Sequence, residues 1–193
     1  MTDLAANTTH NSLHYFGPDY LTESTGSQGT YHHTASSLAL VPDATNSETV
    51  LNQARQQALE LQLPFAGSIS PPEAWKLTQD HAATLVDVRT NEERHFVGYI
   101  PKSLHVAWAT GTQMNKNPRF VKELEAKIKD KAEIILLLCR SGKRSAAAAQ
   151  ALTKAGFTNV FNVQEGFEGE LNASLQRGLQ GGWRWHNLPW VQE

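Results

Sequence analysis

The feature that most constrains the fold is an apolar run followed directly by a basic, glycine-containing segment. Residues 134–138 read Ile-Ile-Leu-Leu-Leu, which predicts a fully buried strand. Residues 139–145 read Cys-Arg-Ser-Gly-Lys-Arg-Ser, and an alanine-rich helix is expected from about Ala146 to Ala155. A strand, a short loop and a helix in this order are typical of an α/β protein with a parallel sheet.

Cys139 is the only cysteine of the chain, and its surroundings favour a reactive thiolate. A thiol at a strand-to-helix turn faces the unpaired N–H groups and the positive dipole end of the helix. Arg140, Lys143 and Arg144 add positive charge, and the thiolate is the nucleophilic form of cysteine. The plainer alternative is a small buried residue without chemistry. Cations at a helix start oppose the dipole, however, unless an anion binds among them.

Composition narrows the class of protein. A length of 193 residues fits one domain with some chain left over, and a net charge of −2 gives no reason to expect nucleic acid or a membrane as partner. A single cysteine excludes an intramolecular disulfide framework and a cysteine-cluster metal site. The first residues resemble no signal peptide, and no apolar run approaches membrane-spanning length, so a cytoplasmic protein is expected.

Three regions follow from the pattern along the chain. Residues 1–45 are polar and aperiodic and predict a disordered or loosely attached arm, in which His32-His33 is expected to be solvated and not a metal site. Residues 46–66 predict an amphipathic helix and a linker; the helix is capped by Ser47 and either packs on the domain or mediates self-association. Residues 68–191 form the main domain.

Helices and strands alternate in the main domain, which predicts a parallel sheet covered on both faces. The expected strands are 84–88, 104–106, 134–138 and 160–163, and the expected helices are 71–79, 91–97, 119–129, 146–155 and a final one from Glu165.

The main domain carries short motifs in a fixed order: residues 85–89 with Glu92-Glu93, 98–103, 138–145, 155–157, 162–163, 165–167, 182–183 and 188–190. Their order resembles the rhodanese family of sulfurtransferase domains. One departure is Tyr99-Ile100-Pro101-Lys102-Ser103, where family members commonly have His-Ile-Pro-Gly-Ala. The resemblance implies a rhodanese-like three-layer α/β fold, with a central parallel sheet of about five strands flanked by helices. A second departure from the family is the stretch from Thr110 to Asn117, which looks like an insertion.

The resemblance also implies a reaction. Cys139 would attack the outer sulfur of thiosulfate or of a persulfide donor, form a cysteine persulfide, and pass the sulfur to cyanide in an assay or to a thiol or protein in the cell. The chemistry of the loop agrees, because an anionic donor needs positive charge to approach a thiolate. No cofactor, metal, nucleic acid or membrane is expected to take part.

The expected site consists of Cys139 and the residues around it. Gly142 is expected to supply either a backbone conformation or a close approach of the anion that a Cβ would block. Ser145 is expected to take a helix-cap position and to bond loop amides. Asp87 is expected to support the site by pairing with Arg89 or a loop residue, since an unpaired buried carboxylate is costly. His105 and Trp108 are expected either to line the pocket or to have a role in the core or at the rim. The substrate-binding candidates are Arg140, Ser141, Gly142, Lys143, Arg144 and Ser145.

Two other functions fit parts of this pattern. Cysteine phosphatases carry an arginine six residues after the cysteine, whereas Arg144 comes five residues after Cys139, so phosphatase activity is not expected. A non-catalytic or redox-sensing rhodanese-like binding module remains an alternative. A redox sensor often carries a resolving cysteine, and this chain has no second one.

Overall fold

The structure, a computed structural model, describes residues 47–192, and both the predicted arm and His32-His33 lie outside them. No helix in this part of the chain is long and apolar enough to cross a membrane. The elements in chain order are α1 (Ser47–Glu60), β1 (Gly67–Ile69), α2 (Pro71–Gln79), β2 (Thr84–Asp87), α3 (Asn91–Val97), β3 (Leu104–His105), β4 (Ala109–Thr110), β5 (Asn115–Lys116), α4 (Phe120–Lys127), β6 (Ile135–Leu138), α5 (Lys143–Lys154) and β7 (Val160–Val163).

Five strands form a parallel sheet in the order β1-β7-β6-β2-β3, which confirms the predicted fold class. In the register of the two neighbouring strands β2 and β6, Asp87 lies beside Leu138. The loops that leave these two strands therefore begin side by side at the carboxyl end of the sheet, which is where ligands bind in open α/β sheets.

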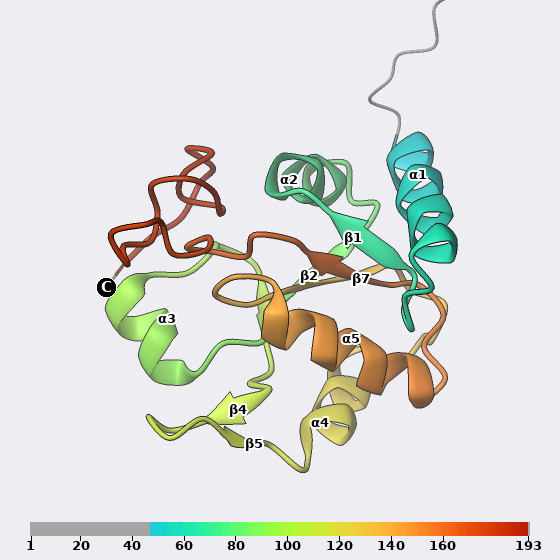
Figure 1. Cartoon of the computed structure of the whole chain (residues 1–193). Helices are drawn as coiled ribbons and strands as arrows, with labels where there is room; N and C mark the ends of the chain where they lie inside the picture. The colour runs from blue at the N-terminus through green and yellow to red at the C-terminus, as the bar shows by residue number, and fades with distance from the viewer. Residues whose placement is uncertain (1–46, 193) are drawn as a thin grey trace, which may run out of the picture. The chain divides into compact units, whose positions relative to one another are not determined.

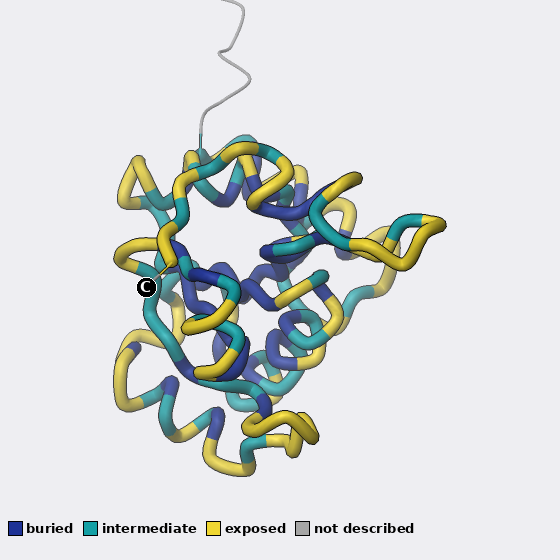
Figure 2. Tube along the Cα trace, turned by 90° about the vertical axis from the view of Figure 1, so that its left-hand side faces the viewer, coloured by how far each residue is buried: buried dark blue, intermediate teal, exposed yellow. Residues whose placement is uncertain are grey.

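Helices cover both faces of the sheet (Figure 1): α1 and α2 lie on one side, and α4 and α5 on the other. Strand β6 is buried on both faces, as its apolar run predicts. Leu136 and Leu138 pack toward α1 and α2, whereas Leu137 and Cys139 pack toward α4 and α5. Figure 2 shows the buried positions gathered at the centre of the trace and the exposed ones at its periphery.

Helix α1 packs on the domain, which is one of the two roles predicted for it. Leu51 is 1% exposed and belongs to the same apolar cluster as Leu136 and Phe161 of the sheet. Ser47 was expected to cap this helix, but its hydroxyl donates a hydrogen bond to Asp80 at the end of α2 (2.9 Å). Ser47 therefore links the start of α1 to the end of α2 instead of capping its own helix.

The predicted helix from Glu165 is wrong, since no helix follows β7 in residues 164–192. Glu165, Gly166 and Gly169 have φ of 64°, 65° and 78°, and right-handed helices require negative φ. The chain instead makes tight turns that pack against the loop after β6. Strand β1 was not predicted, and neither was the hairpin of β4 and β5, which overlaps the stretch expected to be an insertion. These strands have only two or three residues each, too few for a periodic signal.

Gly166 lies against the backbone of the cysteine loop, and its replacement is a test of this packing. A Cβ at Gly166 would lie 2.5 Å from the carbonyl oxygen of Cys139, whereas a Cβ at Gly178 meets nothing within 4 Å. Both glycines have left-handed φ, so both alanine variants carry a strain of about 1–2 kcal/mol. Gly166→Ala is expected to lose a further ~1–3 kcal/mol of unfolding free energy in urea titrations because backbone must move. Equal losses for Gly166→Ala and Gly178→Ala would contradict this packing.

Candidate active site

Cys139 is the first residue after β6 and lies beneath the start of α5. It is 1% exposed and shares an apolar cluster with Ala148 and Ala149 of α5. The apolar surroundings hold the thiol in place at the carboxyl end of the sheet. Only a narrow group can reach a sulfur atom that is buried to this degree.

The turn from β6 into α5 depends on Gly142. Its φ is 88°, a conformation that suits glycine, and it is the N-cap residue of α5. The helix begins at Lys143, three residues before the expected start at Ala146. Ser145 is therefore inside the first turn, and the prediction that it caps the helix is wrong, because the left-handed glycine brings the chain into the helix sooner.

The loop after Cys139 presents a run of free backbone donors. Within the described residues, the N–H groups of residues 140–145 find no hydrogen-bond acceptor. A helix start leaves its first N–H groups unpaired, and the tight loop adds others. Successive free N–H groups beside a helix start form a site that is suited to an anion.

Ser145 joins the thiol to a buried amide. Its Oγ lies 3.2 Å from Cys139 Sγ, 3.0 Å from the carbonyl oxygen of Gly142 and 2.6 Å from Asn162 Oδ1. Asn162 was not predicted as a site residue. The signal was present, since Asn162 is the one polar residue of the buried strand Val160–Val163, and buried polar groups are normally hydrogen-bonded.

The three loop cations have different environments. Arg144 makes two hydrogen bonds to the carboxylate of Glu93, at 2.7 and 2.6 Å. The Lys143 side chain is 80% exposed and pairs with Glu170 at 3.1 Å. Arg140 is exposed, and its guanidinium makes no ion pair or hydrogen bond with any described residue. Arg140 is therefore the cation of this loop that is free to meet an anion.

The predicted support from Asp87 takes the form of a fully buried ion pair. The Arg89 Nη2 group donates to Asp87 Oδ2 at 2.7 Å and to the Gly98 carbonyl at 2.8 Å. Arg94 is a second arginine that donates to the same carboxylate, at 2.9 Å. Burial alone would raise the pKa of Asp87, but the charges and hydrogen bonds of Arg89 and Arg94 outweigh it and keep the pKa below its usual range.

Glu93 connects α3 to the cysteine loop. Its carboxylate accepts the backbone N–H of Thr90 at 3.0 Å, which caps α3, and also binds Arg144. Burial alone would raise the pKa of Glu93, but the bonds from Arg144 and Thr90 lower it. Burial would likewise lower the pKa of Arg144, but Glu93, with the nearby Cys139 and Asp87, raises it. The charges of this pair are therefore firmly held.

His105 and Trp108 have structural contacts. His105 Nε2 lies 2.8 Å from the carbonyl oxygen of Arg89, and Trp108 packs edge-on against Phe120 at 5.0 Å between ring centroids. Of the two predicted alternatives, these contacts favour a role in the core for Trp108 and in fixing the loop after β2 for His105.

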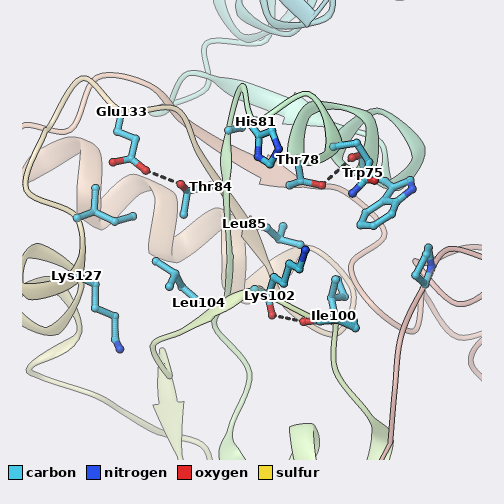
Figure 3. A pocket seen from close by; sticks show the side chains of 16 residues that line it. Trp75, Thr78, His81, Thr84, Leu85, Ile100, Lys102, Leu104, Lys127 and Glu133 are labelled. Atoms are coloured by element: carbon cyan, nitrogen blue, oxygen red, sulfur yellow. Dashed lines mark hydrogen bonds between the residues drawn. The ribbon is translucent and has the colours of Figure 1, made fainter.

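A cavity of about 610 Å³ lies away from the cysteine (Figure 3). Figure 3 shows Trp75, Leu85 and Ile100 among its lining side chains, with Glu133 accepting a hydrogen bond from Thr84. Thr84 is the first residue of β2, so the cavity is at the amino end of the sheet, opposite to Cys139. The cavity is therefore separate from the candidate site.

Comparison with known proteins identifies the family. A family model described as "Rhodanese-like domain" matches residues 70–173, which is more than half of the chain. The chain therefore belongs to the rhodanese-like family, as its motifs predict.

The chain is also similar to curated proteins and to a solved structure. An uncharacterised RP600 homologue of Rickettsia rickettsii is 40% identical over 121 residues, covering 59% of this chain and 87% of its own. A protein named thiosulfate sulfurtransferase GlpE, from Actinobacillus pleuropneumoniae, is 31% identical over 101 residues, with coverages of 52% and 82%. The crystal structure of Rv0390 from M. tuberculosis has 41% identity and a TM-score of 0.60, over 67% of this chain and 99% of that one.

The Glu93–Arg144 pair predicts a specific dependence of stability on pH. The pKa of Glu93 is below its usual value of 4.5 in the folded protein, so its contribution is present above that value and is lost as the pH falls through the folded pKa. Glu93→Gln is expected to lower the unfolding free energy by about 1–3 kcal/mol at neutral pH. The difference from the unmodified protein should shrink as the carboxyl group is protonated in acid.

Urea unfolding at a series of pH values from neutral to acidic measures this difference. The matched control is Glu125→Gln, which removes an exposed ion pair with Lys131 and should leave the pH dependence unchanged. A constant difference between Glu93→Gln and the unmodified protein across the series would contradict the assigned role of Glu93.

Proposed function

We propose that this protein is a sulfurtransferase. It takes a sulfane sulfur from thiosulfate or a persulfide donor, carries it as a persulfide on Cys139, and delivers it to a thiophilic acceptor. The observation that carries the proposal is the run of unpaired N–H groups at residues 140–145 beside the buried thiol. Membership of the rhodanese-like family and the similarity to a protein named thiosulfate sulfurtransferase support it.

In the loading step, the Cys139 thiolate attacks the terminal sulfur of the donor. A new sulfur–sulfur bond forms, the bond inside thiosulfate breaks, and its electron pair leaves with sulfite. The free N–H groups of the loop meet the charge on the donor and on the persulfide that remains. The narrow approach to Cys139, which is 1% exposed, favours a donor that presents a single terminal sulfur atom.

In the delivery step, an acceptor attacks the outer sulfur of the persulfide. The sulfur–sulfur bond breaks, its electron pair stays on Cys139 Sγ, and the thiolate is regenerated. Cyanide serves as acceptor in an assay, and a small thiol or a protein thiol in the cell. Covalent catalysis of this kind splits the transfer into two displacements and needs no adjacent general base.

The environments of the loop cations suggest separate roles. Arg140, which has no partner among the described residues, is the first candidate for the oxygens of the donor. Arg144 is held by Glu93, so it supplies a fixed positive charge near the thiolate and secures the loop. Lys143 is exposed and paired with Glu170, so it has the smallest expected part in binding the donor. Ser141 and Gly142 contribute backbone N–H groups.

The remaining expectations stay predictions. The catalytic unit is residues 68–191, with residues 46–66 as helix and linker and residues 1–45 as an arm, in a cytoplasmic protein.

A non-catalytic or redox-sensing binding module is the alternative function. The bidentate bond between Glu93 and Arg144 argues against a cysteine phosphatase, in which the loop arginine binds the phosphoryl group.

The first prediction is that thiosulfate loads the protein. Intact mass should rise by one sulfur atom on Cys139, and cyanide should remove that sulfur and release thiocyanate. Cys139→Ala should show neither change, because the attacking thiolate is absent. If Cys139 stays unmodified with thiosulfate and with a persulfide donor, the protein is a binding module and the proposed function is wrong.

The second prediction separates the loop cations. Arg140→Ala should raise KM for thiosulfate by about tenfold or more, because a hydrogen bond from a charged group to the donor is lost. Lys143→Ala removes the same charge from the same loop and is the matched control, with an expected change of less than about threefold. Steady-state kinetics with cyanide as acceptor measure both. Equal effects of the two variants would contradict the role given to Arg140.

A further inference from the structure

Ser145 and Asn162 form a buried link to the thiol that the chemistry above does not use. Cys139, Ser145 and Asn162 are 1%, 0% and 7% exposed, so water cannot easily replace their hydrogen bonds. Ser145 Oγ has three neighbours within hydrogen-bond distance: Cys139 Sγ, the Gly142 carbonyl oxygen and Asn162 Oδ1. A hydroxyl group carries one hydrogen, so it can donate to only one of them at a time.

The orientation of the Asn162 amide decides where that hydrogen goes. With Oδ1 toward Ser145, the short 2.6 Å contact takes the hydroxyl hydrogen, and Ser145 offers Cys139 only a lone pair. This arrangement suits a protonated thiol, which can donate to Ser145 Oγ. With the amide turned over, Nδ2 donates to Ser145 Oγ, and the hydroxyl hydrogen is free to point at Cys139 Sγ. That arrangement suits a thiolate.

Turning the amide over costs little in this site. The Nδ2 group of Asn162 makes no hydrogen bond with any described residue, so no existing bond of that group is lost. The Gly142 carbonyl already accepts the N–H of Ala146 at 3.1 Å, which makes it a weaker competitor for the Ser145 hydrogen. The thiolate is then the best remaining acceptor, because hydrogen bonds to charged groups are the stronger ones.

We propose that Asn162 is a positioning residue that turns its amide with the charge state of Cys139 and thereby directs the Ser145 hydroxyl onto the thiolate sulfur. For turnover, this inference rests on the proposed sulfurtransferase function. In delivery, the bond between the two sulfurs breaks and its electron pair returns to Sγ, so the Ser145 hydrogen bond stabilises the departing thiolate. In loading, the hydrogen bond from Ser145 to Sγ must break, because Sγ loses its negative charge. Ser145 and Asn162 therefore favour delivery over loading.

The test follows the rate of Cys139 alkylation by iodoacetamide against pH, which requires no sulfur transfer. Ser145→Ala removes the donor and is expected to raise the pH of half-maximal rate by about one unit, a roughly tenfold slower reaction near neutral pH. Asn162→Leu, similar in shape but without hydrogen-bonding groups, should move the same midpoint in the same direction by a smaller amount. At high pH, where Cys139 is ionised in each variant, the alkylation rates of the variants and the unmodified protein should converge.

The double variant decides whether Asn162 acts through Ser145. If it does, Ser145→Ala/Asn162→Leu has the same alkylation profile as Ser145→Ala alone. An Asn162→Leu profile identical to that of the unmodified protein overturns the proposal, and so does a double variant that is slower than Ser145→Ala at every pH. A purely structural role would lower the urea midpoint of unfolding and leave the pH of half-maximal alkylation in place, which also overturns it.

The two half-reactions give a second readout. With sulfur-loaded protein, Ser145→Ala should slow the release of sulfur to cyanide more than it slows loading from thiosulfate. Equal slowing of both steps would contradict the part assigned to Ser145 in delivery. If the unmodified protein does not load at all, the proposed function fails, whereas the alkylation profiles still decide the roles of Ser145 and Asn162.

Discussion

The buried ion pair between Asp87 and Arg89 is the interaction on which the rest of the site depends. Both side chains are 0% exposed, and removing either partner would leave an uncompensated charge in the core, at a cost of about 3–5 kcal/mol. The pair fixes the chain where it leaves β2, and the bond from Arg89 to the Gly98 carbonyl ties the far end of α3 to the same point. Helix α3 is thereby held against the carboxyl end of the sheet.

Glu93 extends this support to the cysteine loop. A single carboxylate caps α3 through Thr90 and binds Arg144 in the first turn of α5. Arg144 is therefore held from outside the loop, while the N–H groups of residues 140–145 and the guanidinium of Arg140 find no partner among the described residues. Cys139 is therefore supported in two ways. The Glu93–Arg144 ion pair holds the loop that follows it, and a neutral hydrogen-bonded link runs from its thiol through Ser145 to Asn162.

Much of this architecture could be predicted from the sequence because the signals are local. The apolar run before Cys139 and the glycine at 142 lie within a few neighbouring residues. The expected strands β2, β3, β6 and β7 appear within one residue of their observed bounds. The final helix was wrong because left-handed turns at Glu165 and Gly166 are set by packing against Cys139, which the composition of that segment does not reveal.

By itself, the sequence determined the alternation of strands and helices, the family, and the position of the single cysteine after a buried strand, since each depends on residue type and spacing. Only the tertiary structure decided how the side chains of the site are paired. Glu93 and Arg144 are 51 residues apart, and Ser145 and Asn162 are 17 apart, in elements that meet only in the folded sheet. Such partners depend on distances and directions in space, which neither periodicity nor local propensity specifies.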